Sequence, residues 1–181
     1  MRIIGGEAKG RRLGLPKDCR IRPTSDRIKE ALFNLLYPVS GKSFLDLYAG
    51  SGSVGLEALS QDAAKVVFVE KNPVLIHLIK KYLRECGFKD RYAVLAVDVR
   101  QGIKLLESRP ERFDIVFADP PYEKDLIDRT IEWIGTSRLV AEDGVAVIQH
   151  STREGIHDSG VFELFDQRRY GDTILSFLKL R

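Results

Sequence analysis

From Lys42 onward, short apolar segments alternate with amphipathic ones, and this alternation constrains the fold more than any other feature of the sequence. The apolar segments are predicted strands at residues 43–47, 65–70, 92–97, 113–118 and 145–149. Alternating strands and helices predict a mostly parallel sheet with helices on both faces. Two further β-like runs, 162–170 and 173–179, are joined only by Gly171-Asp172 and predict a C-terminal antiparallel hairpin. We therefore expect a seven-stranded α/β sheet.

Helix signals lie between these strands and also before the first of them. A leading helix is predicted to start at Thr24 or Ser25, either of which can cap it, and to end at Pro38. Asn72-Pro73 is a strong helix start, and Gly87 is a stop. The helices predicted between strands cover residues 52–59, 72–86, 99–107 and 126–134.

Charge divides the chain more clearly than composition does. The first 22 residues carry a net charge of +5, and the rest of the chain sums to −2. We predict that residues 1–22 form a basic β-hairpin arm. Residues 23–181 would form the main domain, with a leading helix in 23–41 and the core sheet in 42–181. The excess of positive charge favours a polyanionic partner, although a solvated basic surface would have the same composition.

Several classes of protein are disfavoured by the sequence. No apolar run approaches the roughly 20 residues of a transmembrane helix, and the N-terminus has no signal-peptide pattern. Cys19 and Cys86 are the only cysteines, which argues against a disulfide framework or a cysteine zinc site and fits a reducing compartment. The three histidines show no paired ligand spacing. We expect a cytoplasmic protein without a membrane span or a metal site.

The ends of the predicted strands are where a ligand is expected, because open parallel sheets bind ligands beyond the carboxyl ends of their strands. Residues 46–52 (DLYAGSG) follow the first strand, and their glycines allow a sharp turn that approaches a ligand closely. Glu70, twenty residues after Gly50, can accept hydrogen bonds from two ribose hydroxyls. Together they predict a nucleoside-containing cofactor. They do not distinguish a nicotinamide dinucleotide from S-adenosylmethionine, since residues 50–55 also fit GxGxxG.

Asp119-Pro120-Pro121-Tyr122, directly after the fourth strand, is the most specific motif in the chain. Two prolines fix φ and donate no N–H, so the turn is stiff and its carbonyls are free to accept hydrogen bonds. A carboxylate and a carbonyl facing one way can receive an –NH2 group. The Tyr122 ring can stack on the heterocycle that carries this amine. The simpler explanation is a rigid strand-to-helix loop without a ligand.

These motifs resemble those of class I S-adenosylmethionine-dependent methyltransferases that modify exocyclic amines. Residues 2–6 (RIIGG), 10–11 (GR) and 22–27 (RPTSDR) narrow the resemblance to the RsmD-type 16S rRNA guanine-N2 methyltransferases. It covers essentially the whole chain. It implies a Rossmann-like fold, S-adenosylmethionine as methyl donor without a metal, and 16S rRNA or the assembling small ribosomal subunit as partner. We also expect a monomer.

The resemblance and the charge pattern together predict three sets of site residues. Those predicted to bind the cofactor are Thr24, Arg27, Asp46, Tyr48, Ala49, Gly50, Ser51, Gly52, Glu70, Lys71, Asp98 and Val99. Those predicted to act on the amine are Asp119, Pro120, Pro121 and Tyr122. Those predicted to contact RNA are Arg2, Arg11, Arg12 and Arg22. Glu70 would hold the ribose, and Asp98 would hold the adenine amine, cap the following helix, or do both. Relatives often have Phe in place of Tyr48, whose hydroxyl has no assigned role.

Three alternatives remain at this point. A DNA or RNA adenine-N6 methyltransferase would use the same Asp119 to Tyr122 motif, but the core leaves no segment for a DNA-recognition domain. An NAD-dependent dehydrogenase would explain the glycine turn and Glu70 but not that motif. A non-catalytic RNA-binding protein would not require the motif at all. A protein glutamine methyltransferase is disfavoured because similar enzymes carry Asn where this chain has Asp119.

Overall fold

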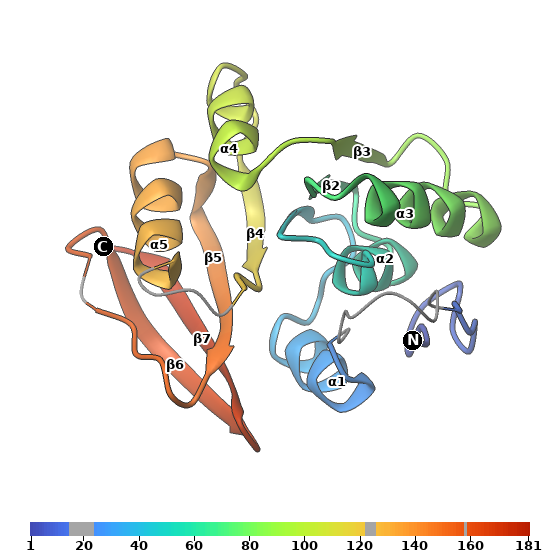
Figure 1. Ribbon diagram of the computed structural model, residues 1–181. Coiled ribbons are helices and arrows are strands. Elements are labelled where there is room, and N and C mark those ends of the chain that lie inside the picture. Colours follow the sequence, from blue (N-terminus) through green and yellow to red (C-terminus); the bar gives the residue numbers. More distant parts are fainter. Residues whose placement is uncertain (15–23, 122–125, 158) are drawn as a thin grey trace.

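A seven-stranded sheet of order β3-β2-β1-β4-β5-β7-β6 forms the centre of the computed structural model, which describes residues 1–14, 24–121, 126–157 and 159–181 (Figure 1). The parallel strands are β1 (Ser43–Leu47), β2 (Lys65–Val69), β3 (Tyr92–Leu95), β4 (Phe113–Ala118) and β5 (Val140–Ser151). The antiparallel strands are β6 (Phe162–Tyr170) and β7 (Thr173–Leu180). The predicted sheet and its C-terminal hairpin are confirmed.

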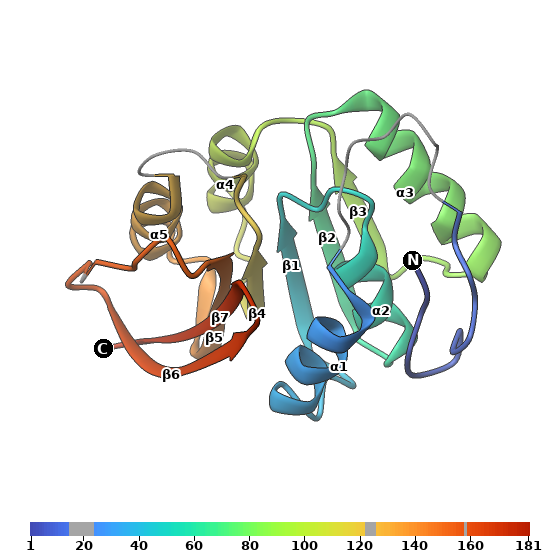
Figure 2. The same ribbon diagram turned by 60° about the horizontal axis from the view of Figure 1, so that its bottom comes forward.

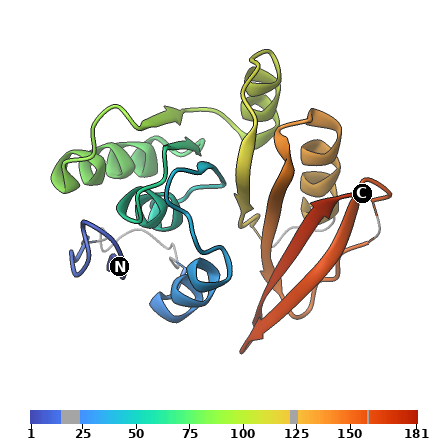
Figure 3. The ribbon, with the colours of Figure 1, turned by 180° about the vertical axis from the view of Figure 1, so that it is seen from behind.

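Helices cover both faces of this sheet (Figures 1 and 3). One face carries α1 (Asp26–Leu35), α2 (Ser53–Ser60) and α3 (Pro73–Cys86), and the other carries α4 (Val99–Glu107) and α5 (Leu126–Ser137). Side chains alternate between the faces, so Phe44 packs with the first group of helices and Leu45 with the second. This burial on both sides explains why the strands are nearly continuous apolar runs.

The strand order creates a switch point between β1 and β4. The chain builds β1, β2 and β3 outward and then returns to place β4 on the other side of β1. Figure 2 shows β1 and β4 side by side in the middle of the sheet. Ligands of open α/β sheets bind at the carboxyl ends of strands at such a point.

Most predicted element ends lie within three residues of the observed ones: β3 ends at Leu95 instead of 97, and α5 continues to Ser137 instead of ending at 134. β5 differs most. The Asn72 side chain accepts from the N–H of Val74 at 2.9 Å, and Gly87 ends α3 in the left-handed conformation. β5 was expected at 145–149 but starts at Val140. The prediction was wrong because exposed polar residues 142–143 look like a loop, whereas they lie beside a register shift between β4 and β5.

The basic N-terminal segment, residues 1–14, packs on the body of the protein. The predicted hairpin is reduced to one antiparallel bridge between Arg2 and Arg12 within the described residues. Ile3, Ala8 and Leu13 are buried in the same cluster as the apolar faces of α1, α2 and α3. The inner side of this segment therefore belongs to the core. Residues 15–22 of the predicted arm lie outside the described residues.

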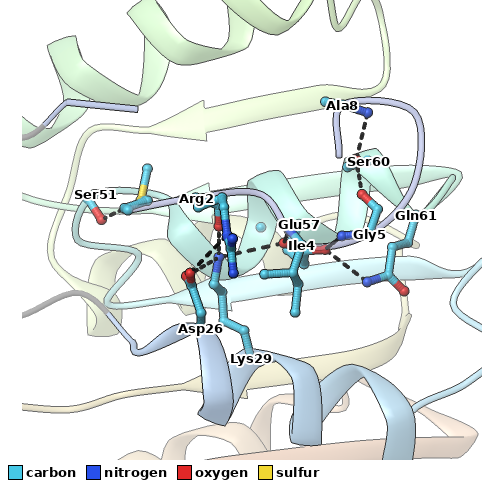
Figure 4. Close-up of polar contacts among 12 residues, drawn as sticks. Arg2, Ile4, Gly5, Ala8, Asp26, Lys29, Ser51, Glu57, Ser60 and Gln61 are labelled. Carbon is cyan, nitrogen blue, oxygen red and sulfur yellow. Dashed lines mark hydrogen bonds and ion pairs between the residues drawn. The ribbon is translucent and has the colours of Figure 1, made fainter. Parts of the chain in front are cut away.

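A buried carboxylate on α2, Glu57, holds this segment in place (Figure 4). Its two oxygens accept from the main-chain N–H groups of Ile4 at 2.9 Å and Gly5 at 2.8 Å. The ammonium of Lys29, also buried, lies 3.6 Å from Glu57 and donates to the Arg2 carbonyl. The network thus joins the first residues of the chain to α1 and α2.

The Gly5-Gly6 pair fits against the end of α2. Gly6 has φ +71°, and a Cβ there would lie 1.6 Å from the Ser60 carbonyl oxygen. The Ser60 hydroxyl donates to the Gly5 carbonyl at 2.6 Å and accepts from the Ala8 N–H at 2.9 Å. No side chain fits at position 6 without moving the segment, so this sequence motif has a structural cause.

Replacing Glu57 by leucine should lower the free energy of unfolding by about 3–5 kcal/mol, because the buried Lys29 ammonium and two main-chain amides would lose their acceptor. Urea unfolding followed by circular dichroism measures this change. Glu30→Leu, at an exposed position of α1, is the matched control and should stay within about 0.5 kcal/mol of the parent. A loss below about 1 kcal/mol for Glu57→Leu would contradict the assigned role.

Candidate active site

The carboxyl ends of β1 and β4 bring Asp46 and Asp119 to the switch point. Asp46 is 1% exposed, and its Oδ2 accepts from the N–H of Gly55 at 2.9 Å. Burial raises the pKa of Asp46 to about 8, the Gly55 N–H lowers it, and the charges of Asp119 and Glu70 raise it. A carboxyl with this pKa is mostly protonated in the free protein at neutral pH.

The loop after β1 is held by the carboxylate that follows β2. Tyr48, Gly50 and Gly52 all have positive φ, between 57° and 77°, which costs a tyrosine more than a glycine. Glu70 Oε2 accepts from the N–H of Gly50 at 2.8 Å, and Oε1 accepts from the N–H of Asn72 at 2.8 Å. The glycine turn and the acidic strand end, read as separate signals, are therefore one hydrogen-bonded unit.

The Tyr48 hydroxyl joins this loop to α5. It lies 2.8 Å from the Thr130 hydroxyl, which itself donates to the Leu126 carbonyl at 2.7 Å. Because a threonine hydroxyl has one proton to donate, Tyr48 is the donor in this pair. The contact gives a structural role to a hydroxyl that the sequence left unexplained.

Two cavities share Tyr48 and Asp119 in their linings. The larger, of about 340 Å³, also has predicted site residues in its wall, namely Glu70, Lys71, Asp98, Val99 and Pro121. The smaller, of about 140 Å³, likewise contains Thr24, Asp46, Ala49, Gly50 and Ser51. The structure thus brings most of the predicted cofactor residues around one region at the switch point.

Three predicted residues that the structure describes line neither cavity. Arg27 is exposed at the start of α1, Gly52 is the N-cap of α2, and Pro120 is buried. Tyr122 lies outside the described residues. Asp98 caps α4 by accepting from the N–H of Gln101 at 3.1 Å while it lines the larger cavity, so capping does not remove it from the site.

The sequence did not identify every residue that lines the larger cavity. Its wall also contains Val69, Val97, Arg100, Leu126 and Trp133. A signal was present for two of these, because Leu126 and Trp133 lie seven residues apart on one helix and therefore on one face. They add an aliphatic and an aromatic side chain to the cavity that Glu70, Asp98 and Asp119 also line.

Asp119 has a hydrogen-bond partner on the neighbouring strand. Its Oδ2 accepts from Gln149 Nε2 at 2.9 Å, while Oδ1 has no hydrogen bond within the described part of the chain. Burial raises the pKa of Asp119 to about 7, with the Gln149 contact lowering it and the charge of Glu154 raising it. Gln149 was not predicted, although β4 and β5 pair in parallel register and extending that register would have found it.

Two of the arginines predicted to contact RNA, Arg2 and Arg11, already make contacts within the protein. Arg2 is paired with Asp26 at 3.2 Å but keeps a 53% exposed side chain. Arg11 donates to the Glu85 carbonyl, and Arg12 is exposed. Arg22 lies outside the described residues.

A larger groove of about 840 Å³ runs between the N-terminal segment and α1. Its charges are mixed, and none of the strand-end carboxylates lines it. Within the described ranges, no three His, Cys, Asp or Glu side chains gather where they could hold a metal ion. No helix in those ranges is long and apolar enough to cross a membrane. Because the strand-end carboxylates line the two smaller cavities and not this groove, we place the candidate active site at the switch point.

The strand order, the glycine loop and the switch-point carboxylates define a class I methyltransferase fold. A family model described as "Conserved hypothetical protein 95" matches residues 1–179. Ribosomal RNA small subunit methyltransferase D of Haemophilus influenzae is 40% identical over 148 residues, covering 77% of this chain and 76% of that protein. The protein of that name from Escherichia coli K12 is 32% identical over 157 residues, covering 86% and 77%.

A solved structure of a hypothetical protein from Thermus thermophilus, TTHA0928, has a TM-score of 0.85 and 34% identity, and covers 99% of both chains. The chain belongs to the family that this model and these methyltransferase D relatives represent. The resemblance deduced from residues 2–6, 10–11 and 22–27 is confirmed at the level of the family.

The free energy of unfolding should fall as the pH rises from about 4 to about 8, because the folded protein keeps the Asp46 proton that the unfolded chain has lost. Asp46→Asn has no such proton, so its stability should fall less over this interval. Part of the slope should remain, because the raised pKa of Asp119 acts in the same direction. Urea unfolding across this pH range measures the slope.

Asp143→Asn, at an exposed position of β5, is the control for this measurement and should keep the parent's slope. An unchanged slope in Asp46→Asn would show that the buried carboxyl is not the source of the pH dependence.

Proposed function

We propose that the protein transfers a methyl group from S-adenosylmethionine to the exocyclic N2 amine of a guanine in 16S rRNA. The observation that carries the proposal is Asp119, which lines both cavities and has one oxygen held by Gln149 and the other available. The relatives at 32% and 40% identity are named ribosomal RNA small subunit methyltransferase D, which supports RNA of the small subunit as substrate. We further propose that the enzyme works in the cytoplasm as a monomer, since the described residues around both cavities come from one chain.

The residues around the two cavities fit this methyl donor. Glu70 and Asp98 present carboxylates suited to ribose hydroxyls and to the adenine amine, and Trp133 offers a flat apolar face. The main chain at 49–51 and the Asp46 carboxyl suit the polar methionine portion. When bound, S-adenosylmethionine supplies a methyl group made electrophilic by a sulfonium sulfur.

Asp119 would act on the guanine amine by accepting its protons. The lone pair of this amine is delocalised into the ring, so the amine is a poor nucleophile. Hydrogen bonds from its protons to the Asp119 carboxylate and to the carbonyl of Pro120 would favour a pyramidal nitrogen with a localised lone pair. The carboxylate would also stabilise the positive charge that develops on the nitrogen. After methylation this nitrogen is acidic, so no strong base is required.

The basic segment would capture RNA near this site. Thr24 lines both the smaller cavity and a groove of about 670 Å³ whose wall contains Arg2 and Arg12. The Ser51 hydroxyl, in the cofactor loop, contacts the Met1 sulfur at 3.4 Å. RNA phosphates on this segment would therefore lie beside the cofactor loop, and the target base would leave its stack at a cost of a few kcal/mol. Stacking by Tyr122 stays a prediction.

Mass spectrometry of nucleosides tests the reaction. The enzyme is incubated with S-adenosylmethionine and one of three substrates: naked small-subunit RNA, purified small subunits, or DNA. N2-methylguanosine in the RNA is the expected product. N6-methyladenosine in RNA or N6-methyladenine in DNA would favour the adenine alternative. Absence of any methylated nucleoside from all substrates would contradict the proposal.

Asp119→Ala should lower kcat by about 10²–10³, because the positive charge that develops on the amine nitrogen loses the carboxylate that stabilises it. Binding of S-adenosylhomocysteine should stay nearly unchanged. Transfer from labelled cofactor measures the rate, and calorimetry measures the binding. Asp143→Ala, at an exposed position of β5, is the matched control. Near-normal turnover of Asp119→Ala would overturn the mechanism.

Reversing the charge of Arg11 and Arg12 together, each to Glu, should weaken RNA binding and reduce the slope of log K against log salt by about one to two units, because phosphate contacts are lost. Filter binding at several salt concentrations measures the slope. The same change at Lys104 and Arg109, which are exposed on α4 and just beyond it, is the control. An unchanged slope for the Arg11 and Arg12 variant would leave the segment as a solvated basic surface.

A further inference from the structure

Gln149 of β5 is the neighbour that the sheet itself gives to Asp119. β4 and β5 run parallel, with Phe117 opposite Val147 and Ala118 opposite Ile148. One step further along this register places Asp119 beside Gln149 at the carboxyl ends of both strands. Gln149 Nε2 donates to Asp119 Oδ2 at 2.9 Å, and the Gln149 residue is 9% exposed.

The position of the Gln149 amide is unfavourable for the stability of the folded protein. Its Oε1 is buried and has no hydrogen bond within the described residues. A buried acceptor without a partner is unfavourable, so folding alone does not favour an amide at this position. A carboxylate rotates readily about its terminal torsion, and a fixed N–H donor on one oxygen restricts that rotation. The contact therefore determines where the second oxygen of Asp119 lies.

The end of β5 also supplies a charge that acts on Asp119 in the opposite sense. Glu154 folds back on the strand end, where its Oε2 accepts from the N–H of Ser151 at 3.1 Å. Its negative charge raises the pKa of Asp119, whereas the Gln149 N–H lowers it. The Asp46 carboxyl faces the same group from β1. Within the described residues Gln149 is the side chain that donates a hydrogen bond to Asp119, and Lys71 and Arg100 are the basic residues that line the same cavity.

We propose that Gln149 is a positioning residue for methyl transfer, which holds Oδ2 of Asp119 so that Oδ1 faces the amine to be methylated. This positioning role rests on the proposed function, because that function makes Asp119 the acceptor of the amine protons. The charge of Glu154 acts on the same carboxylate and limits the fraction that is ionised near neutral pH.

The pH dependence of kcat separates positioning from a general structural effect. The rate should rise with pH as Asp119 ionises. Gln149→Met keeps the length of the side chain but removes the donor, so its profile should shift to higher pH. A shift of about one unit corresponds to a rate about tenfold lower on the acidic limb, with a smaller difference at high pH. A loss by one constant factor at every pH would overturn the proposal.

Two further variants give the experiment an internal check. Glu154→Gln removes the opposing charge and should shift the profile to lower pH. Gln167→Met is the matched control, because Gln167 donates to Ser176 on β7 at 2.8 Å and makes no contact with Asp119 in the described structure. Its profile should coincide with that of the parent. If Gln149→Met does not fold, Gln149→Asn keeps the amide but shortens its reach, and the same upward shift is expected.

Carboxyl ¹³C NMR of Asp119, without RNA or cofactor, makes the test independent of activity. The Asp119 titration should move upward in Gln149→Met and downward in Glu154→Gln. If these shifts occur but the parent methylates no nucleoside, the contact stands and the proposed function fails. If the parent methylates RNA but the titrations and rate profiles of Gln149→Met match the parent, the positioning role is overturned.

Discussion

The side-by-side parallel pairing of β1 with β4 is the constraint on which the site depends. It brings two carboxyl groups, Asp46 and Asp119, to the same edge and the same face of a sheet that helices cover on both sides. Carboxylates in such a place lose hydration and repel one another. Hydrogen bonds partly compensate for this loss, since the Gly55 N–H donates to Asp46 and the Gln149 amide donates to Asp119.

The N-terminal segment combines two requirements that the sequence suggested were separate. Its inner side carries Ile3, Ala8 and Leu13 into the core, and its main chain is held by Glu57 (Figure 4). Its outer side keeps the side chains of Arg2, Arg11 and Arg12 exposed. The position of this surface relative to the loop after β1 is therefore set when the protein folds.

Local signals in the sequence were sufficient for most of the fold. Caps and stops such as Asn72 and Gly87 depend on neighbouring residues only, so they could be read directly. The contacts that were missed join residues far apart in the chain, including Tyr48 with Thr130, 82 positions away, and Asp119 with Gln149, 30 positions away. Such pairs become visible only once strand order and register are known. The start of β5 was missed because an irregular pairing does not follow the alternation expected of a strand.

The absence of a side chain at Gly6 helps to distinguish sequences that fold their first residues in this way from sequences that do not. The methyl-transfer motifs of the core are shared by many enzymes, whereas the space at position 6 is closed by the Ser60 carbonyl at the end of α2. A chain with the same core but a larger residue there would have to carry its first residues along another path. The glycine pair at 5–6, together with an acidic residue at the position of Glu57, can therefore identify sequences whose N-terminal segment packs into the core in the same way.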